Sequence, residues 1–446
     1  MTNKTFRMLI AAALAVGLTT VGVPAAMAQS GDAALAARVK HVLTQTPLID
    51  DHNDLPWEIR QRFGNVGGVD LAASTADLPP SKPGGQPIHL MTDIPRLHKG
   101  QVGGQFWSVW IPATVTGPAA VKMTMEEIDI VRTMAARYPQ DLQMAYSADD
   151  VMRAFKAGRV ASMIGVEGGH QIDDSMAVLR GMYVLGARYM TLTHTLDNDW
   201  ADSATDAPRH HGLTPFGRAV VHEMNRVGML VDLSHVSPDT MRDALKSSVA
   251  PVMFSHSGAR ALDDHPRDVP DDVLKMVAQN HGVVMATFAT QYVSPAENQW
   301  EADRAAEQTR FSAPPYAGLY IGQPERAKAA LAEWDRQHPQ PVTTLAMVAD
   351  HIEHIRKVAG VDCVGIGSDF DGIPDTPRGL EGVDKFPALL QELARRGWSD
   401  QDLAKVAGGN ILRVMREAAA VAARLQKTEL PSFATIEQLD GKVAGK

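Results

Sequence analysis

The chain has 446 residues, of which 45% are hydrophobic and 21% are charged, so it can bury a large core and is not intrinsically disordered. Asp and Glu number 52 against 43 Lys and Arg, and this negative balance argues against nucleic acid or an anionic membrane surface as a partner. The single cysteine, Cys363, excludes an internal disulfide framework and a cysteine-rich zinc module, so a metal site would need His, Asp and Glu side chains.

The amino-terminal segment has the pattern of a cleavable signal peptide. Lys4 and Arg7 precede an apolar run over 8–23, and small residues flank Met27 so that cleavage is expected after Ala28. The alternative, a retained anchor helix, is disfavoured because the run is short for a membrane span and no second apolar stretch follows. We therefore expect residues 1–28 to be removed, no membrane anchor afterwards, and a periplasmic or secreted protein.

Strand-like apolar runs alternate with helical patterns along the rest of the chain. The strand-like runs lie at 47–52, 105–111, 161–167, 188–194, 229–235, 251–256, 282–288 and 363–369. Amphipathic helices are expected near 216–227, 238–245, 270–281, 345–358 and 388–396. This alternation predicts parallel βαβ units, and eight such units predict an α/β protein with a (β/α)8 TIM barrel. The alternative is two separate α/β domains.

The predicted barrel domain spans residues 29–426 and is followed by a polar tail, 427–446, that shows no anchor. Three long connections, 57–104, 195–215 and 291–341, each follow a strand and should lie on the catalytic rim. The stretch 291–341 is charged, contains two short helical patterns and is interpreted as an insertion that overhangs the site. Its tryptophans, Trp300 and Trp334, are candidates for a lid or a subunit contact.

Side chains that bind metals follow several of the predicted strands. His52 and Asp54 stand two residues apart at the end of the first strand, so both point the same way. Glu167 closes the third strand, where burial without a cation or donors would be costly, and His235 and His256 close the fifth and sixth. Each alone is more often structural, but together they predict a metal site. Five ligands fit two metals if Glu167 binds both. One metal would then be held by His52, Asp54 and Glu167, and the other by Glu167, His235 and His256. A water or hydroxide between the metals would be the nucleophile.

Three further residues on the same rim have side chains suited to catalysis or substrate binding. Asp369 follows the eighth strand and can take a proton from the nucleophilic water. His194 ends the fourth strand and can face a substrate carbonyl. Arg267 follows the sixth strand and offers a two-point clamp for a carboxylate.

These residues lie in segments that resemble the membrane dipeptidase (renal dipeptidase) family of binuclear zinc peptidases. The matching segments are LIDDHNDLPW at 48–57, GVEGGH at 165–170, MTLTH at 190–194, VDLSHVS at 231–237, FSHS at 254–257, RDVPDDVL at 267–274, GIGSDFDG at 365–372 and GGNILRV at 408–414. The resemblance covers nearly the whole mature chain except 291–341. It implies a metal-dependent hydrolase barrel that cleaves dipeptides, commonly as a homodimer, and in some members also carbapenem-type β-lactams.

The resemblance also assigns roles to individual residues. It implies two Zn²⁺ ions per chain held by His52, Asp54, Glu167, His235 and His256. It further implies that His194 polarises the substrate, that Arg267 binds its carboxylate and that Asp369 is catalytic. This chain departs from the mammalian members, whose lipid anchor and disulfides it is not expected to share.

Two other functions remain as alternatives. Many other metal-dependent barrel hydrolases, such as lactonases and deacetylases, carry H-x-H on the first strand and a bridging lysine on the fourth. Here the first strand has His52-Asn53-Asp54, and 188–194 contains no lysine. A non-catalytic periplasmic binding protein would be expected to lack a ligand or Asp369, and neither is missing. The sequence therefore favours a zinc-dependent dipeptidase acting on small dipeptides.

Overall fold

The computed structural model describes residues 25–80, 87–313 and 317–441. The predicted signal peptide lies mostly outside these residues, and its cleavage stays a prediction. Helix α1 (Ala25–Gln45) begins just before the expected cleavage point. Within the described part of the chain, no helix is both long enough and apolar enough to cross a membrane.

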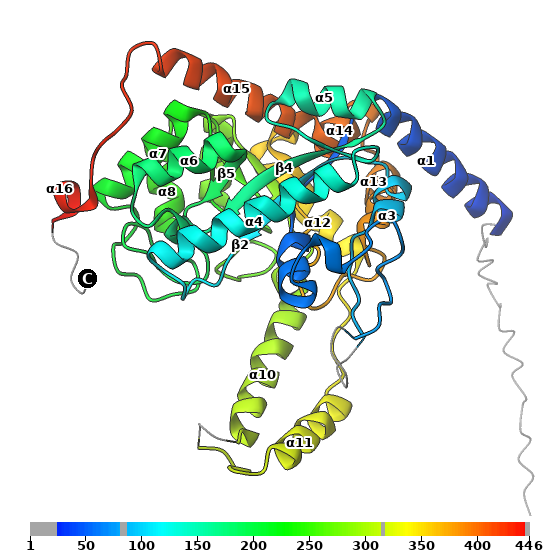
Figure 1. The fold of residues 1–446 in the computed structure, drawn as a ribbon. Coiled ribbons are helices and arrows are strands. Elements are labelled where there is room, and N and C mark those ends of the chain that lie inside the picture. The colour runs from blue at the N-terminus through cyan, green and yellow to red at the C-terminus, as the bar shows by residue number, and fades with distance from the viewer. Residues whose placement is uncertain (1–24, 81–86, 314–316, 442–446) are drawn as a thin grey trace, which may run out of the picture.

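Eight parallel strands form the centre of the molecule, in the order in which they occur along the chain (Figure 1). They are β1 (Leu48–Asn53), β2 (Val102–Trp110), β4 (Val160–Glu167), β5 (Ala187–Thr191), β6 (Leu230–Asp232), β7 (Met253–Phe254), β8 (Val283–Ala286) and β9 (Val364–Ile366). The predicted (β/α)8 barrel is confirmed, and each strand-like run overlaps one of these strands. The sequence patterns missed β3 (Leu142–Met144), a short strand that pairs with β4 beside the barrel.

The barrel closes between its first and last strands through the backbone that follows them. The Asp54 amide donates to the carbonyl of Phe370 at 2.9 Å, and the Asp369 amide donates to the carbonyl of His52 at 3.1 Å. Below this junction, the buried Asp50 carboxylate accepts hydrogen bonds from the backbone and hydroxyl of Ser368, both at 2.7 Å. Closure thus brings the ends of β1 and β9 together where both carry predicted site residues.

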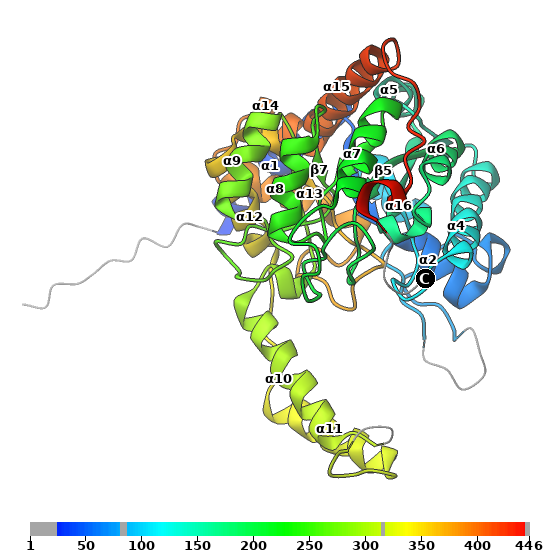
Figure 2. The same ribbon diagram turned by 90° about the vertical axis from the view of Figure 1, so that its left-hand side faces the viewer.

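Helices surround the barrel and cover its outer face (Figures 1 and 2). They are α2 (Leu55–Glu58), α3 (Ile94–Lys99), α4 (Pro118–Arg137), α5 (Ala148–Lys156), α6 (Met176–Leu185), α7 (Pro215–Val227), α8 (Pro238–Ser247), α9 (Asp271–Asn280), α12 (Leu345–Ala359), α13 (Phe386–Arg395), α14 (Asp400–Ala404), α15 (Asn410–Leu425) and α16 (Ile436–Asp440). The helix predicted near 238–245 is α8, and the Ser237 side chain caps its start by accepting a hydrogen bond from the Thr240 amide.

Apolar side chains fill both the barrel interior and the layer between strands and helices. Phe106, Tyr189 and Met285 are among the interior residues. The Tyr189 ring lies so close to Gly165 that a Cβ there would approach the ring's Cζ to 1.9 Å. A glycine at 165 is therefore required by packing, and it leaves room for a tyrosine whose hydroxyl reaches the site above.

The segment predicted as polar tail packs against the body as far as it is described. The Asp440 carboxylate in α16 accepts a hydrogen bond from the Phe216 amide at the start of α7, at 2.8 Å. The Ser432 carbonyl accepts from Arg180 at 2.8 Å. These contacts hold the end of the chain on the outer helices.

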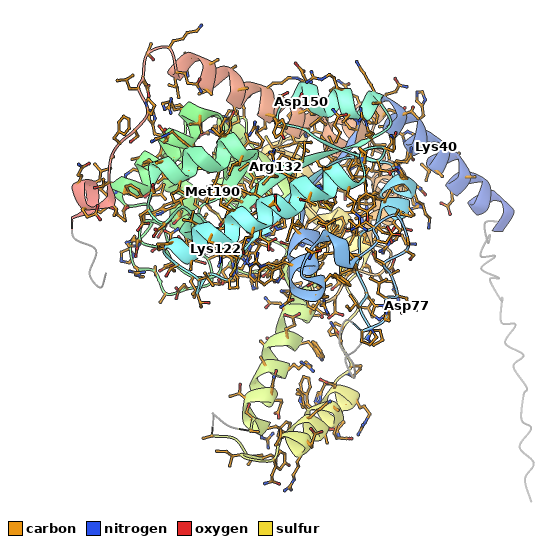
Figure 3. All side chains as sticks on the ribbon, in the orientation of Figure 1. Lys40, Asp77, Lys122, Arg132, Asp150 and Met190 are labelled. Atoms are coloured by element: carbon orange, nitrogen blue, oxygen red, sulfur yellow. The ribbon has the colours of Figure 1, made fainter. Side chains whose placement is uncertain are left out.

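Residues 295–313 and 317–337 form a two-helix arm that projects from the body (Figures 1 and 2). Its helices are α10 (Pro295–Phe311) and α11 (Pro324–Gln337). The arm is held together internally by a two-point ion pair between Arg304 and Asp335, at 2.8 and 3.0 Å, and by packing of Trp300 on Trp334 with 6.0 Å between ring centroids. Glu297 is the one buried side chain in the two helices, and Figure 3 shows side chains projecting from both.

The arm should be separable from the metal-binding body. If residues 301–336 are replaced by a short Gly-Ser linker, we expect bound zinc and melting temperature to change little, because the removed part buries almost nothing against the barrel. Dipeptide selectivity or sedimentation should change, because the segment stands beside the rim. A double Leu319→Ser/Ile321→Ser variant, which changes only exposed side chains near the tip, is the matched control. If selectivity, rate and oligomeric state all stay as in the wild type, the arm has neither role.

Candidate metal centre

All the predicted ligands lie at the carboxyl-terminal rim of the barrel. His52 and Glu167 belong to β1 and β4, Asp54 follows β1, and His235 and His256 follow β6 and β7 within a few residues. Because the strands are parallel, their carboxyl ends meet at one rim, which is why residues far apart in sequence converge here. All five side chains are buried.

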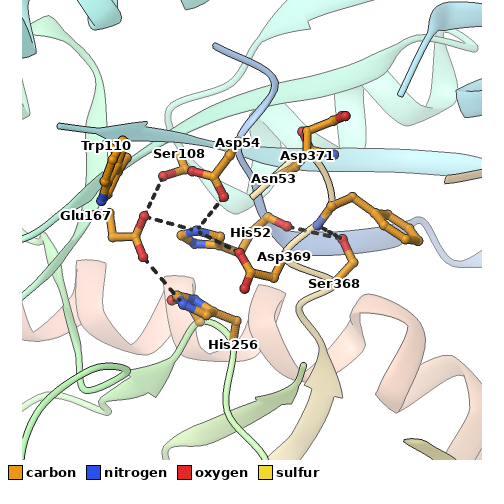
Figure 4. A network of polar contacts seen from close by, with 12 residues as sticks. His52, Asn53, Asp54, Ser108, Trp110, Glu167, His256, Ser368, Asp369 and Asp371 are labelled. Carbon is orange, nitrogen blue, oxygen red and sulfur yellow. Dashed lines mark hydrogen bonds and ion pairs between the residues drawn. The ribbon is translucent and has the colours of Figure 1, made fainter. Parts of the chain in front are cut away.

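Glu167 lies between two groups of side chains, and each of its oxygens faces one group (Figure 4). Its Oε2 lies 3.3 Å from His52 Nε2 and accepts a hydrogen bond from Ser108 at 3.1 Å. Its Oε1 lies 2.9 Å from His235 Nε2 and 3.5 Å from His256 Nε2. A single carboxylate is therefore shared by the two sets of ligand-type residues.

The first group consists of His52 and the carboxylates around it. His52 Nε2 lies 3.2 Å from Asp54 Oδ2 and 3.8 Å from Asp369 Oδ1, yet it has no hydrogen-bond partner (Figure 4). Burial disfavours the charged form of His52, but Tyr189 and the carboxylates of Glu167 and Asp54 raise its pKa well above the usual value. This position thus favours positive charge, and its donor set fits a divalent cation.

The second group pairs His235 with His256. Their Nε2 atoms lie only 3.0 Å apart, with Glu167 beside both. Burial, together with neighbouring cationic groups, lowers the pKa of both histidines well below the usual value, so both are neutral, which is the form that binds metals. Burial also opposes the charge of Glu167, but His52 and the hydrogen bond from His235 hold its pKa well below the usual range. An ionised carboxylate with neutral imidazoles is again a set that fits a divalent cation.

His194 lies beside the second group: its Nε2 is 3.8 Å from Glu167 Oε1, and with Glu167 and His235 it forms a cluster that could hold a metal. The Trp110 indole N–H, which can only donate, points at His194 Nε2 at 3.1 Å. The lone pair of Nε2 is thereby occupied, and the proton of the neutral ring lies on Nδ1, which has no partner. Burial and Arg267 lower the pKa of His194, against the opposing charge of Glu167. The Nδ1 atom is itself buried, whereas the ring as a whole lines the cavity, so a neutral imidazole borders the space where a substrate would lie.

Asp369 lies at the junction that closes the barrel. Its φ is 66°, and His235 also lies in the left-handed region at 68°, a conformation that few non-glycine residues adopt. Gly372 follows in the same turn, where a Cβ would come within 2.2 Å of Asp54 Oδ2. Burial, reinforced by Asp54 and Glu167, raises the pKa of Asp369 well above the usual value. A basic carboxylate beside the ligands can therefore take up a proton.

Arg267 is buried, with 1% of its surface exposed, and among the described residues its guanidinium forms no ion pair with a carboxylate. Its guanidinium makes long contacts, 3.3 Å to the His256 carbonyl and 3.5 Å to Ser257 Oγ, and lies over the Tyr292 ring at 5.2 Å. Tyr292 is among the residues that line the cavity, and Arg267 is not. A buried cation without an anion is costly, so this site favours an anionic ligand.

A cavity of about 330 Å³ opens above these residues. Its walls include Asp54, Glu167, His194, His235 and Asp369. Apolar walls come from Trp57, Trp110, Tyr292, Ile373 and Pro374. No residue of α10 or α11 lines this cavity, so the predicted overhang is limited to the stretch 291–292 at the base of the arm. The volume suits a small ligand.

Several contacts of the site were not predicted from the sequence. Ser108, Trp110 and Tyr189 occupy apolar strand patterns and look like core residues when the chain is read alone. Asp232 precedes His235 by three residues, and Ser255 precedes His256 directly. This closeness in sequence to predicted ligands is the one signal that could have indicated a role for them. Tyr292 lies in the insertion, where no pattern linked it to Arg267.

Comparisons with known proteins agree with this arrangement. The family model described as membrane dipeptidase (peptidase family M19) matches residues 36–429. The solved structure of the probable dipeptidase PvdM from Pseudomonas aeruginosa is 25% identical, covers 87% of this chain and 100% of that one, and superimposes with a TM-score of 0.71.

Two other solved structures share the fold. A metallo peptidase from Rhodobacter sphaeroides, liganded with a phosphinate mimic of the dipeptide L-Ala-D-Ala, is 20% identical over 84% of this chain and 99% of its own, with a TM-score of 0.64. An amidohydrolase from Pseudomonas aeruginosa is 20% identical over 85% of this chain and 98% of its own, with a TM-score of 0.62. The chain belongs to the membrane dipeptidase family, peptidase family M19, and is a metal-dependent dipeptidase.

Proposed function

We propose that the chain is a zinc dipeptidase that holds two zinc ions bridged by Glu167. The observation that supports this most is the position of Glu167, whose two oxygens face separate groups of buried ligand-type side chains. His52 and Asp54 would complete the ligand set of one ion, and His235 and His256 would complete that of the other. Imidazole and carboxylate donors suit zinc.

The reaction that these residues support is hydrolysis of a peptide bond. Bound zinc would polarise the scissile carbonyl and make a water at the centre more acidic. The His194 imidazole, which lines the cavity with its Nε2 3.8 Å from Glu167 Oε1, would stabilise the developing oxyanion. Asp369 would take a proton from the attacking water and deliver it to the leaving amine.

Substrate length would be set by Arg267. Its guanidinium lacks a carboxylate in the protein, and a dipeptide's terminal carboxylate would supply one. The fixed separation between the zinc ligands and this arginine would then select substrates with one residue beyond the scissile bond. Tyr292, which lies over the guanidinium, would form the wall of this subsite.

The cellular setting is a separate part of the proposal. The pattern of Lys4, Arg7, the apolar run 8–23 and the small residues before Gln29 supports export to the periplasm or the exterior. The family resemblance supports a homodimer. Hydrolysis of carbapenem-type β-lactams stays a prediction.

The test is a substrate panel with zinc-loaded protein. We expect hydrolysis of L,L or L,D dipeptides, including L-Ala-D-Ala, and loss of activity when a chelator removes the metal. N-acetyl amino acids and lactones serve as the comparison substrates, because deacetylases and lactonases would prefer them. If these are cleaved and dipeptides are not, the dipeptidase assignment fails.

A further inference from the structure

The ring nitrogen of His256 that points away from the site has a hydrogen-bond partner within the protein. His256 Nε2 faces Glu167 and His235, whereas Nδ1 lies 2.9 Å from Ser255 Oγ. The same Ser255 oxygen lies 2.6 Å from Asp232 Oδ2. A hydroxyl has one proton, and a carboxylate can only accept it, so Ser255 donates to Asp232 and accepts the Nδ1 proton of His256.

The direction of these hydrogen bonds fixes the tautomer of His256. With the proton on Nδ1, the lone pair on Nε2 points at the centre of the site, as a metal ligand requires. Histidine ligands commonly donate their second ring N–H to a carboxylate or another acceptor, which orients the ring and increases its basicity. Here the serine hydroxyl connects the imidazole to a buried carboxylate.

Asp232 is itself held by several donors from neighbouring strands. Its Oδ1 accepts from the backbone amides of Ser255 at 2.8 Å and Ser234 at 3.1 Å, and Thr191 donates a hydroxyl hydrogen bond to Oδ2. The side chain is fully buried. Its position is therefore fixed, and it can hold the Ser255 hydroxyl in one orientation.

The three histidines predicted as ligands differ in this respect. His52 Nδ1 lies 2.8 Å from the hydroxyl of Tyr189, whereas His235 Nδ1 has no hydrogen-bond partner. His256 is the one of the three whose second nitrogen connects to a carboxylate. Its contribution to metal binding should therefore depend on residues that never touch the metal.

We propose that Asp232 acts through Ser255 as a positioning pair for His256, fixing its tautomer and strengthening the second zinc position. This inference rests on the proposed zinc site. Neither residue touches the substrate cavity, whose lining includes neither of them. Their role is to orient a ligand, and they are not catalytic residues.

The test compares two hydroxyl groups that bond to the same carboxylate oxygen. Ser255→Ala removes the hydroxyl between Asp232 and His256. Thr191→Val removes the other hydroxyl that donates to Asp232 Oδ2, and this threonine hydroxyl has no hydrogen bond to a histidine. Zinc affinity is measured on metal-free protein by competition with a chromogenic chelator, and melting temperature is recorded in parallel. We expect Ser255→Ala to weaken one of the two zinc ions about 10- to 100-fold, the range found for outer partners of ligands, and Thr191→Val to leave both affinities within about threefold.

Asp232→Asn is the second variant and should weaken the same zinc ion as Ser255→Ala. With Co²⁺ in place of zinc, both variants should change the visible absorption of the ion, which reports on its ligands, and Thr191→Val should not. Wild-type affinities in Ser255→Ala overturn the proposal, as does equal weakening in all three variants with equal loss of melting temperature, because that pattern indicates a structural role alone. If the wild-type protein itself binds neither Zn²⁺ nor Co²⁺, the proposed zinc site and this inference are both wrong.

Discussion

Replacing Glu167 with alanine should weaken both zinc ions at once, by at least about 100-fold each, which exceeds the loss expected for a partner outside the ligand shell. The reason is geometric, since Oε1 and Oε2 face separate groups of ligand-type residues, and no other carboxylate of the described chain is recorded in contact with both. Dipeptide hydrolysis should fall on the order of 10³-fold, because the several kcal/mol of charge stabilisation supplied by the metals is lost. Zinc content after dialysis and kcat at fixed zinc are the measurements.

Glu127→Ala is the matched control for this substitution. Glu127 is as deeply buried as Glu167 and lies 3.5 Å from Arg60 Nε, but it belongs to none of the groups of described residues that could hold a metal. Its replacement removes a buried carboxylate without removing a ligand and should leave two zinc ions bound. Retention of one zinc at wild-type affinity in Glu167→Ala would show that the sites are independent and that Glu167 does not bridge them.

Blocking the carboxylate of a dipeptide substrate as an amide should lower kcat/KM by about 30- to 5,000-fold, the equivalent of the 2–5 kcal/mol lost when one partner of a buried charge pair is removed. Extension by a third residue should have a similar effect, because an amide again replaces the carboxylate opposite Arg267. Arg267→Lys keeps the charge but loses the planar two-point contact, so it should also lose much of its kcat/KM on the free dipeptide. Kinetics on the dipeptide, its amide and the tripeptide give all three values.

The decisive comparison combines substrate and enzyme changes. In Arg267→Ala the amide should be no poorer a substrate than the free dipeptide, because the group that distinguishes them is gone. Arg260→Lys is the control, since this arginine lies in the same connection but forms its ion pair with Asp264 at 2.8 Å at the surface. Equal cleavage of the three substrates by the wild type would mean that Arg267 is not a carboxylate clamp and that the enzyme accepts longer peptides.

The barrel could be predicted because its signals are local and repeated. Each apolar run is long enough to form a strand, and helix starts such as Ser237-Pro238 are marked by caps. The short strand β3 was missed because Leu142–Met144 lies among polar residues and is stabilised by pairing with β4. The direction of the arm was also missed, since helical periodicity in 295–337 reports which residues form helices and says nothing about what they pack against.

The metal centre could be predicted as a set of residues because strand ends of a parallel barrel meet at one rim. Its finer chemistry could not, because it depends on contacts between residues far apart in sequence. Trp110 and His194 belong to different strands, yet their hydrogen bond decides which nitrogen of His194 carries the proton. Likewise, the contact between Arg267 and the Tyr292 ring depends on how the 291–292 stretch folds back, which no local pattern encodes.

The most direct measurement is a zinc titration of metal-free protein with dipeptide hydrolysis followed at each step. If Glu167 bridges two ions, activity should rise to a plateau at about two zinc equivalents per chain, and metal analysis of the active protein should give the same ratio. Full activity at one equivalent, with no second zinc bound, would contradict the bridged centre.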